Sequence, residues 1–186
     1  MIQKLFTLAA TLALTANIAA AAPVHTDRKD FQLFKDIANS VDRYTRFTIF
    51  DDISASVNEG VVTLTGKVTM PYKRGDLEKR IAKIDGVREV RNQITVLPVS
   101  IFDDELRYTI ARRIYGNSNF WNYAIMPNPP IHIVVEHGRV TLTGVVSSEV
   151  DRMLARALAS QSAAFSVTSA LKTDAEMREA LDKQSE

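Results

Sequence analysis

Hydrophobic and polar residues alternate in two stretches of this chain, and the two stretches are close copies of each other. Residues 53–68 read ISASVNEGVVTLTGKV, and residues 131–146 read IHIVVEHGRVTLTGVV. At an offset of 78 residues, nine of the sixteen aligned positions are identical. Alternation on both sides of a turn is typical of a β-hairpin, and Gly60 and Gly138 supply the turns. The sequence therefore predicts one hairpin that occurs twice.

Apolar residues at helical spacing follow each predicted hairpin. Residues 71–84 begin with a proline and carry an apolar stripe of Leu77, Ile81 and Ile84. In the second copy, Ser147 or Ser148 is the expected N-cap of a stripe formed by Val150, Leu154, Ala157 and Leu158. Gly66 and Gly144 fall on the inward side of the second strand, where we expect them to let the covering helix approach closely.

A helix is also predicted before each hairpin, and a third strand after each second helix. The first of these helices has an apolar face of Phe31, Phe34, Ile37, Ala38, Val41 and Tyr44. The second carries Leu106, Ile110 and Ile114 behind Asp103, which is the expected cap. Each copy is therefore predicted to contain, in order, a helix, two strands, a second helix and a third strand.

The first 22 residues differ from the rest and predict an export signal. Lys4 precedes an apolar stretch, and small residues follow it in the order of a secretory signal with a cleavage site. We therefore divide the chain into a signal peptide (1–22), a first domain (23–98), a second domain (99–174) and a polar C-terminal tail (175–186). The expected location is the periplasm, where a chain with no cysteine avoids oxidative mispairing.

The repeated motif resembles the BON domain, whose signature joins a glycine turn, V-x-L-x-G-x-V, a helix and G-V-x-x-V-x-N-x-L-x-V. The first copy carries all of it: Gly60, Val62, Leu64, Gly66, Val68, Gly86, Val87, Val90, Asn92, Ile94 and Val96. The second keeps the hairpin part, but has Ala163, Ser169 and Thr173 at three later signature positions. With its export signal, this tandem arrangement is similar to the osmotically inducible periplasmic proteins. The resemblance implies the fold class α+β: two αββαβ sandwiches, each a three-stranded mixed sheet packed against two helices. It also implies a non-catalytic role at the envelope, described in the family as phospholipid or membrane-surface binding.

Composition limits the chemistry that the chain can perform. The net charge is +1, which argues against a nucleic-acid binder, and the absence of cysteine removes thiolate chemistry. The sequence contains no phosphate-binding glycine loop and no nucleophile elbow. His132 and His137 fit surface histidines better than a metal pair. We therefore expect no enzyme activity, no cofactor and no metal site.

Residues 116–130 form an insertion relative to the first copy and are the first candidate for a binding surface. They contain Phe120, Tyr123 and the single tryptophan, Trp121, just after Arg112 and Arg113. Aromatic rings beside cations suit a membrane interface, and they equally suit a protein hot spot. A third interpretation is that the loop folds back and covers the core.

The helix over residues 71–84 is the second candidate. Its basic side chains outnumber its acidic ones: Lys73, Arg74, Lys79, Arg80 and Lys83. Basic residues on one face can attract an anionic leaflet, although an ordinary solvated helix face has the same pattern.

Two functional hypotheses remain after these observations. The first is an exported, non-catalytic envelope protein that binds anionic phospholipid surfaces weakly, linked to envelope or osmotic stress. The second is a soluble periplasmic module that binds envelope proteins, with a chaperone-like role. No stretch after the export signal is apolar enough to cross a membrane, so we expect no transmembrane helix in the mature form.

Overall fold

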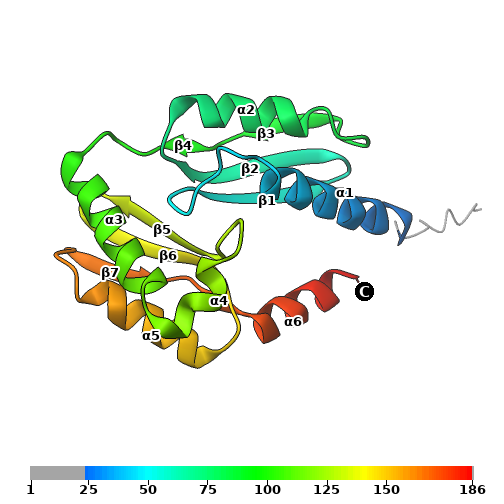
Figure 1. Ribbon diagram of the computed structural model, residues 1–186. Helices are drawn as coiled ribbons and strands as arrows, with labels where there is room; N and C mark the ends of the chain where they lie inside the picture. The colour runs from blue at the N-terminus through cyan, green and yellow to red at the C-terminus, as the bar shows by residue number, and fades with distance from the viewer. Residues whose placement is uncertain (1–23, 186) are drawn as a thin grey trace, which may run out of the picture.

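The computed structural model describes residues 24–185, in which two similar αββαβ units lie side by side (Figure 1). The predicted export signal, residues 1–22, lies outside the described residues. The first unit contains α1 (Val24–Asp42), β1 (Asp52–Asn58), β2 (Val61–Val68), α2 (Pro71–Ile81), β3 (Glu89–Asn92) and β4 (Thr95–Val96). The strand β1 runs antiparallel to β2, and β3 and β4 run parallel to β2 on its other side.

The second unit repeats this order and adds two helical segments. It contains α3 (Ile101–Tyr115), the 3-10 turn η1 (Ser118–Phe120), α4 (Trp121–Ala124), β5 (Ile131–Glu136), β6 (Arg139–Val146), α5 (Glu149–Ser160), β7 (Ser166–Ser169) and β8 (Lys172–Thr173). The helix α6 (Asp174–Ser185) follows and contacts α1. The predicted fold class is confirmed, with the third strand of each sheet formed by two short pieces.

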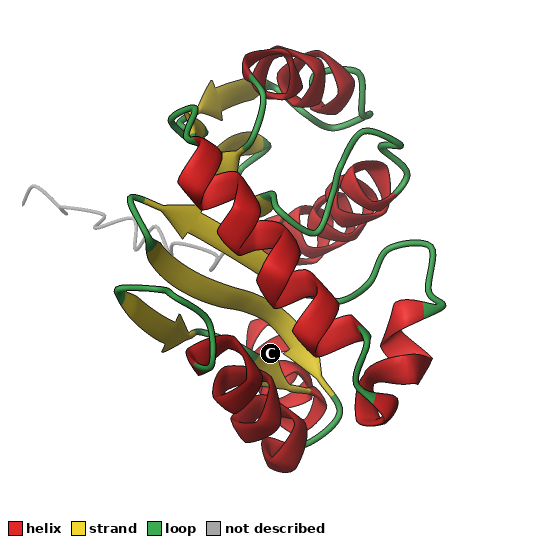
Figure 2. Ribbon diagram, turned by 60° about the vertical axis from the view of Figure 1, so that its left-hand side comes forward, coloured by secondary structure: helices red, strands yellow, loops and turns green. Residues whose placement is uncertain are grey.

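Each unit has its own core between one face of its sheet and its helices (Figures 1 and 2). The strand positions predicted to point inward do so, as Leu64 and Leu142 show by their complete burial. The stripe predicted for the second covering helix is partly wrong. Ala155 and Ala159 are its buried residues, whereas Val150 and Ala157 face solvent. Ser148 caps this helix as expected, accepting a hydrogen bond from Asp151 N.

An aspartate near the start of the first helix fixes the hairpin turn in each unit. Asp103 accepts hydrogen bonds from His137 N and Gly138 N, and Asp30 accepts them from the corresponding turn of the first hairpin. These amides belong to turns that contain positive φ angles. The prediction that Asp103 caps its helix is wrong, because Ser100 is the N-cap. The aspartates instead join the helix and hairpin within each unit.

Gly66 and Gly144 are required for a reason that differs from the predicted one. Their φ angles are +118° and +110°, a region that residues with a Cβ rarely adopt. A Cβ at either position would collide with the backbone of the neighbouring strand, at Asp52 O or Pro130 O. The close approach is therefore made by the partner strand of the hairpin and not by the covering helix.

The two units meet along a polar and aromatic seam. Ile133 N at the edge of β5 donates a hydrogen bond of 2.7 Å to Ile49 O, in the segment that precedes β1. His132 Nδ1 lies 2.6 Å from Asp51 O, which means that this nitrogen carries the proton. Lys67 and Glu136 form an ion pair across the seam. These contacts hold residues 47–51 of the first unit against the second.

Candidate functional site

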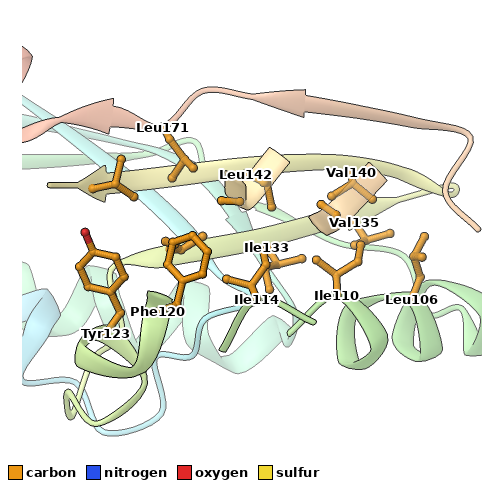
Figure 3. Packing of buried hydrophobic residues seen from close by; sticks show 14 residues of the cluster. Leu106, Ile110, Ile114, Phe120, Tyr123, Ile133, Val135, Val140, Leu142 and Leu171 are labelled. Atoms are coloured by element: carbon orange, nitrogen blue, oxygen red, sulfur yellow. The ribbon is translucent and has the colours of Figure 1, made fainter. Parts of the chain in front are cut away.

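The predicted loop of residues 116–130 folds onto the second core. It forms η1 and α4, and from them the side chains of Phe120 and Tyr123 point toward the sheet (Figure 3). Phe120 is completely buried, and its ring lies 5.8 Å from that of Tyr123. The expectation that these two aromatic residues serve as an exposed binding surface is therefore wrong. The insertion contributes to the core, as the third interpretation of the sequence proposed.

Tyr123 also anchors the insertion by hydrogen bonds. Its hydroxyl accepts a bond of 2.8 Å from Ser147 N and lies within bonding distance of Ser147 Oγ and Asp151 Oδ2. The insertion is thereby attached to the start of α5, at the position where the chain leaves the sheet. The rest of α4 is fixed relative to the core as a result.

The remaining apolar side chains of the insertion face solvent. Trp121 is 68% exposed and Ile125 is 70% exposed, and Met126 is also exposed. Arg112 and Arg113, at the end of α3, are exposed nearby in the sequence. We call Arg112, Arg113, Trp121, Ile125 and Met126 the α4 surface. Of the five candidate residues predicted from the sequence in this region, Arg112, Arg113 and Trp121 belong to this surface.

A groove lies beside the α4 surface, at the seam between the units. Its larger part measures about 570 Å³ and is lined by Ile49, Tyr108, Ala111, Arg112, Tyr115, Gly116, Ala124 and Pro129. Its smaller part measures about 200 Å³ and is lined by Phe47, Thr48, Ile49, Pro127, Asn128, Pro129 and His132. The two parts share Ile49 and Pro129, and together we call them the seam groove.

The seam groove has one charged side chain. In the described part of the chain, Arg112 makes no ion pair or side-chain hydrogen bond. Burial raises the pKa of Tyr115, whose hydroxyl donates to Ile131 O at 2.5 Å, so this phenol is occupied and stays protonated. Such a lining can bind an apolar group that carries an anion.

No motif or local pattern in the sequence marks Tyr108 or Ile49 as residues of a site. Tyr108 lies on the face of α3 opposite the buried stripe, so the helical period alone could have shown that it is exposed. Ile49 reaches the groove only through the docking of the two units, for which the sequence contains no local signal.

The second predicted surface, the basic side of α2, is smaller than expected. Lys73 is 3% exposed and forms an ion pair of 2.5 Å with Asp51, so it cannot serve as a surface cation. Arg80 is half-buried and donates to Ser40 O. Arg74, Lys79 and Lys83 remain exposed. Lys73 is buried because α2 places its ammonium group directly beside the buried carboxylate of Asp51.

Asp51 is held ionised by this arrangement. Burial alone would raise its pKa, but hydrogen bonds from Lys73, Thr69 and Thr48 outweigh that effect and keep the pKa below its usual range. The carboxylate accepts bonds from the backbone and hydroxyl of both threonines. The group is fully paired, which is the state expected of a structural buried charge.

Within residues 24–185, no cluster of three or more His, Asp or Glu side chains is placed to hold a metal ion. His132 packs on Phe47 at the seam, and His137 lies in the second hairpin turn with a φ of 51°. None of the helices described is both long and apolar enough to span a membrane.

Comparisons with known proteins place these features in context. The family model of the BON domain matches residues 30–98 and 110–175, together more than two thirds of the chain. No curated protein matches. Among solved structures, the chain is similar to CdsD, a structural protein of the type III secretion system of Chlamydia trachomatis, with 11% identity and a TM-score of 0.30 over 80% of this chain and 97% of that one. The C-terminal domain of CdsD matches with 11% identity and a TM-score of 0.28 over 76% of this chain and 96% of the other.

Proposed function

Because this chain is a member of the BON-domain family, we propose that it is a non-catalytic protein of the cell envelope that binds anionic phospholipid surfaces through its α4 surface. BON domains are associated with phospholipid binding, and proteins that contain them are typically periplasmic or envelope-associated and generally non-catalytic. The export of this chain through a cleaved signal and its link to osmotic or envelope stress belong to the proposal.

The composition of the α4 surface is the observation that supports the proposal. Trp121, Ile125 and Met126 are exposed on a segment whose other side is anchored in the core. Aromatic and aliphatic side chains of this kind enter the headgroup region of a bilayer, and a neighbouring arginine can meet the phosphates. Each cation near an anionic leaflet adds about 1 kcal/mol, so Arg112 and Arg113 support only weak, salt-sensitive binding.

Vesicle binding tests the proposal directly. The protein is mixed with neutral and with anionic phospholipid vesicles at low and high salt, and Trp121 fluorescence is recorded together with co-sedimentation. We expect a blue shift and co-sedimentation with anionic vesicles only, weakened by salt. Trp121 is the single tryptophan, so its emission reports on the α4 surface alone.

A pair of matched variants locates the contact. Ile125→Ser removes an exposed apolar residue of the α4 surface, and Val150→Ser removes one of similar exposure on α5, at 70% and 66%. Binding should weaken for Ile125→Ser and stay unchanged for Val150→Ser. Equal behaviour of the two variants would mean that another surface meets the lipid, and the reduced basic side of α2 (Arg74, Lys79, Lys83) would be tested next.

A different feature favours the second hypothesis, in which the protein binds other envelope proteins. At the opposite end of the second unit, Val99 is 99% exposed, and Ile101, Phe102 and Phe165 are exposed as well. The rings of Phe102 and Phe165 lie 6.1 Å apart. Clustered exposed hydrophobic residues mark contact sites for proteins as well as for membranes. Vesicle binding that is absent under all conditions would favour this alternative.

A further inference from the structure

The seam groove has properties that a flat membrane contact does not require. A volume of about 570 Å³ for its larger part lies within the range of small-ligand pockets. Ile49, Ala111, Ala124 and Pro129 supply aliphatic walls, and Tyr108 and Tyr115 add ring faces. Apolar walls on several elements suit an alkyl chain, because each methylene that leaves water contributes favourably to binding.

The walls of the groove are held in place before any ligand arrives. Ile49 is fixed by its carbonyl, which accepts from Ile133 N, and Tyr115 is fixed by its bond to Ile131 O. Asn128 Nδ2 donates to Asp42 O at 2.5 Å and thereby ties the loop after α4 to the end of α1. A preformed site loses little conformational entropy on binding, which favours a specific ligand over non-specific adsorption.

The polar groups of the seam groove determine which kind of ligand head group can bind there. In the smaller part, the Thr48 hydroxyl donates to Asp51 Oδ2, His132 Nδ1 bonds to Asp51 O, and Asn128 Nδ2 donates to Asp42 O. Neither part is lined by an acidic residue. Arg112 is therefore the one cation in the lining. Its planar guanidinium matches a carboxylate with two parallel hydrogen bonds.

From this combination we infer that the seam groove binds a single fatty acid, with the alkyl chain along the apolar walls and the carboxylate on Arg112. The inference extends the proposed lipid binding from the membrane surface to a monomeric ligand, and in that sense rests on it. A phospholipid with two chains would leave one chain in water. A lysophospholipid carries its phosphate between glycerol and a further head group, which is bulkier than the carboxylate that a single Arg112 guanidinium matches.

Titration of dodecanoate below its micelle concentration into the full protein tests this assignment, with heat and tyrosine or tryptophan emission as readouts. We expect saturable binding of one molecule per chain. Arg112→Gln should weaken it by about tenfold or more, because a charged hydrogen-bonded contact is lost, whereas Arg156→Gln, at an exposed arginine of α5 outside the groove, should leave it unchanged. Ala124→Phe fills the groove and should abolish binding, whereas Asn122→Phe, on the same short helix and outside the groove, should not.

The ligand series and the vesicle assay separate the possible failures. Equal weakening by Arg112→Gln and Arg156→Gln, or equal affinity for dodecanol and dodecanoate, overturns the role of Arg112. Tighter binding of a lysophospholipid than of dodecanoate overturns the choice of ligand. A protein that binds anionic vesicles and no dodecanoate refutes the groove ligand alone, while one that binds dodecanoate and no vesicles refutes the membrane proposal alone.

Discussion

Different side chains stabilise the junction between the second strand and the covering helix in the two units. In the first unit, Thr69 and Lys73 both bond to the carboxylate of Asp51. At the repeat offset of 78, Ser147 and Asp151 occupy the corresponding positions, and both bond to the hydroxyl of Tyr123. Pro129 stands at the position of Asp51 and offers no acceptor side chain.

This difference explains both the insertion and the charge at the first turn of the helix. Without a carboxylate at position 129, a lysine at position 151 would have no partner, and the chain has an aspartate there. The insertion brings in a phenol that accepts the amide of Ser147 and donates to a neighbouring oxygen. Loss of a hydrogen-bond partner costs less free energy for a buried neutral hydroxyl than for a buried ion pair, because no unpaired charge remains. The two junctions should therefore respond very differently to mutation.

The largest effect is expected for Asp51→Asn. The variant leaves the Lys73 ammonium buried without its counter-ion, and breaking a buried pair in this way costs about 3–5 kcal/mol. Hydrogen exchange resolved by mass spectrometry should show a loss of protection in the first unit, with a smaller effect on the second. As a control, Asp51→Asn combined with Lys73→Met should recover part of the stability. A double variant as unstable as the single one would contradict the ion-pair explanation.

Acid should destabilise the first unit through the same group. The pKa of Asp51 is lower in the folded protein than its ordinary value of 3.8. The stability that this carboxylate adds is fully present above pH 3.8 and is lost as the pH falls through the folded pKa. Urea unfolding followed between neutral pH and pH 3 should show this acid loss in the wild type and a weaker one in Asp51→Asn. An identical pH profile for the two proteins would show that Asp51 does not cause the loss of stability in acid.

The glycines of the second strands should be equally important in both units. Gly66→Ala and Gly144→Ala should each destabilise their own unit by about 1–3 kcal/mol, through a strained φ and a collision with the partner strand. Gly75→Ala provides the control, because a Cβ there meets nothing within 4 Å and the position is helical. That control should stabilise the protein by about 0.5–1 kcal/mol. Thermal melting of the three variants measures these changes. Unchanged melting temperatures for Gly66→Ala and Gly144→Ala would contradict the predicted strain and collision.

The sequence reveals the hairpins and the inward positions, because alternation and turn glycines are local signals. It also reveals that Leu106, Ile110 and Ile114 form one buried stripe. It does not reveal that Lys73 is buried, because its partner Asp51 lies 22 residues away and the contact arises only when α2 docks.

The orientation of the insertion's aromatic side chains stayed open at the level of the sequence for a related reason. Residues 116–130 contain an insertion relative to the first copy, so the repeat could not show that Phe120 and Tyr123 point inward. Trp121 and Arg112, by contrast, are exposed as predicted. The seam groove could not be predicted from the sequence, since most of its lining comes from the first unit or from residues 116–130.

Removal of the Tyr123 hydroxyl should have a smaller effect than removal of the Asp51 charge. Tyr123→Phe keeps the ring against Phe120 and leaves the amide of Ser147 without its partner. Because Ser147 is exposed, water replaces much of the bond, and we expect a loss of roughly 0.5–1.5 kcal/mol, confined to the second unit. Chemical unfolding gives the value. A loss as large as that of Asp51→Asn would show that the phenol and the ion pair are energetically equivalent.

The ion pair across the seam should have the smallest effect on stability. Lys67 and Glu136 are 41% and 37% exposed at their side chains, and pairs of this kind contribute about 0–1 kcal/mol. Lys67→Met should therefore change the free energy of unfolding by less than about 1 kcal/mol, and high salt should reduce even that difference. A double-mutant cycle with Glu136→Gln isolates the pairwise energy, because each single change removes the same contact. A coupling energy well above 1 kcal/mol that persists at high salt would mean that this pair, rather than the backbone bond between Ile49 and Ile133, holds the two units together.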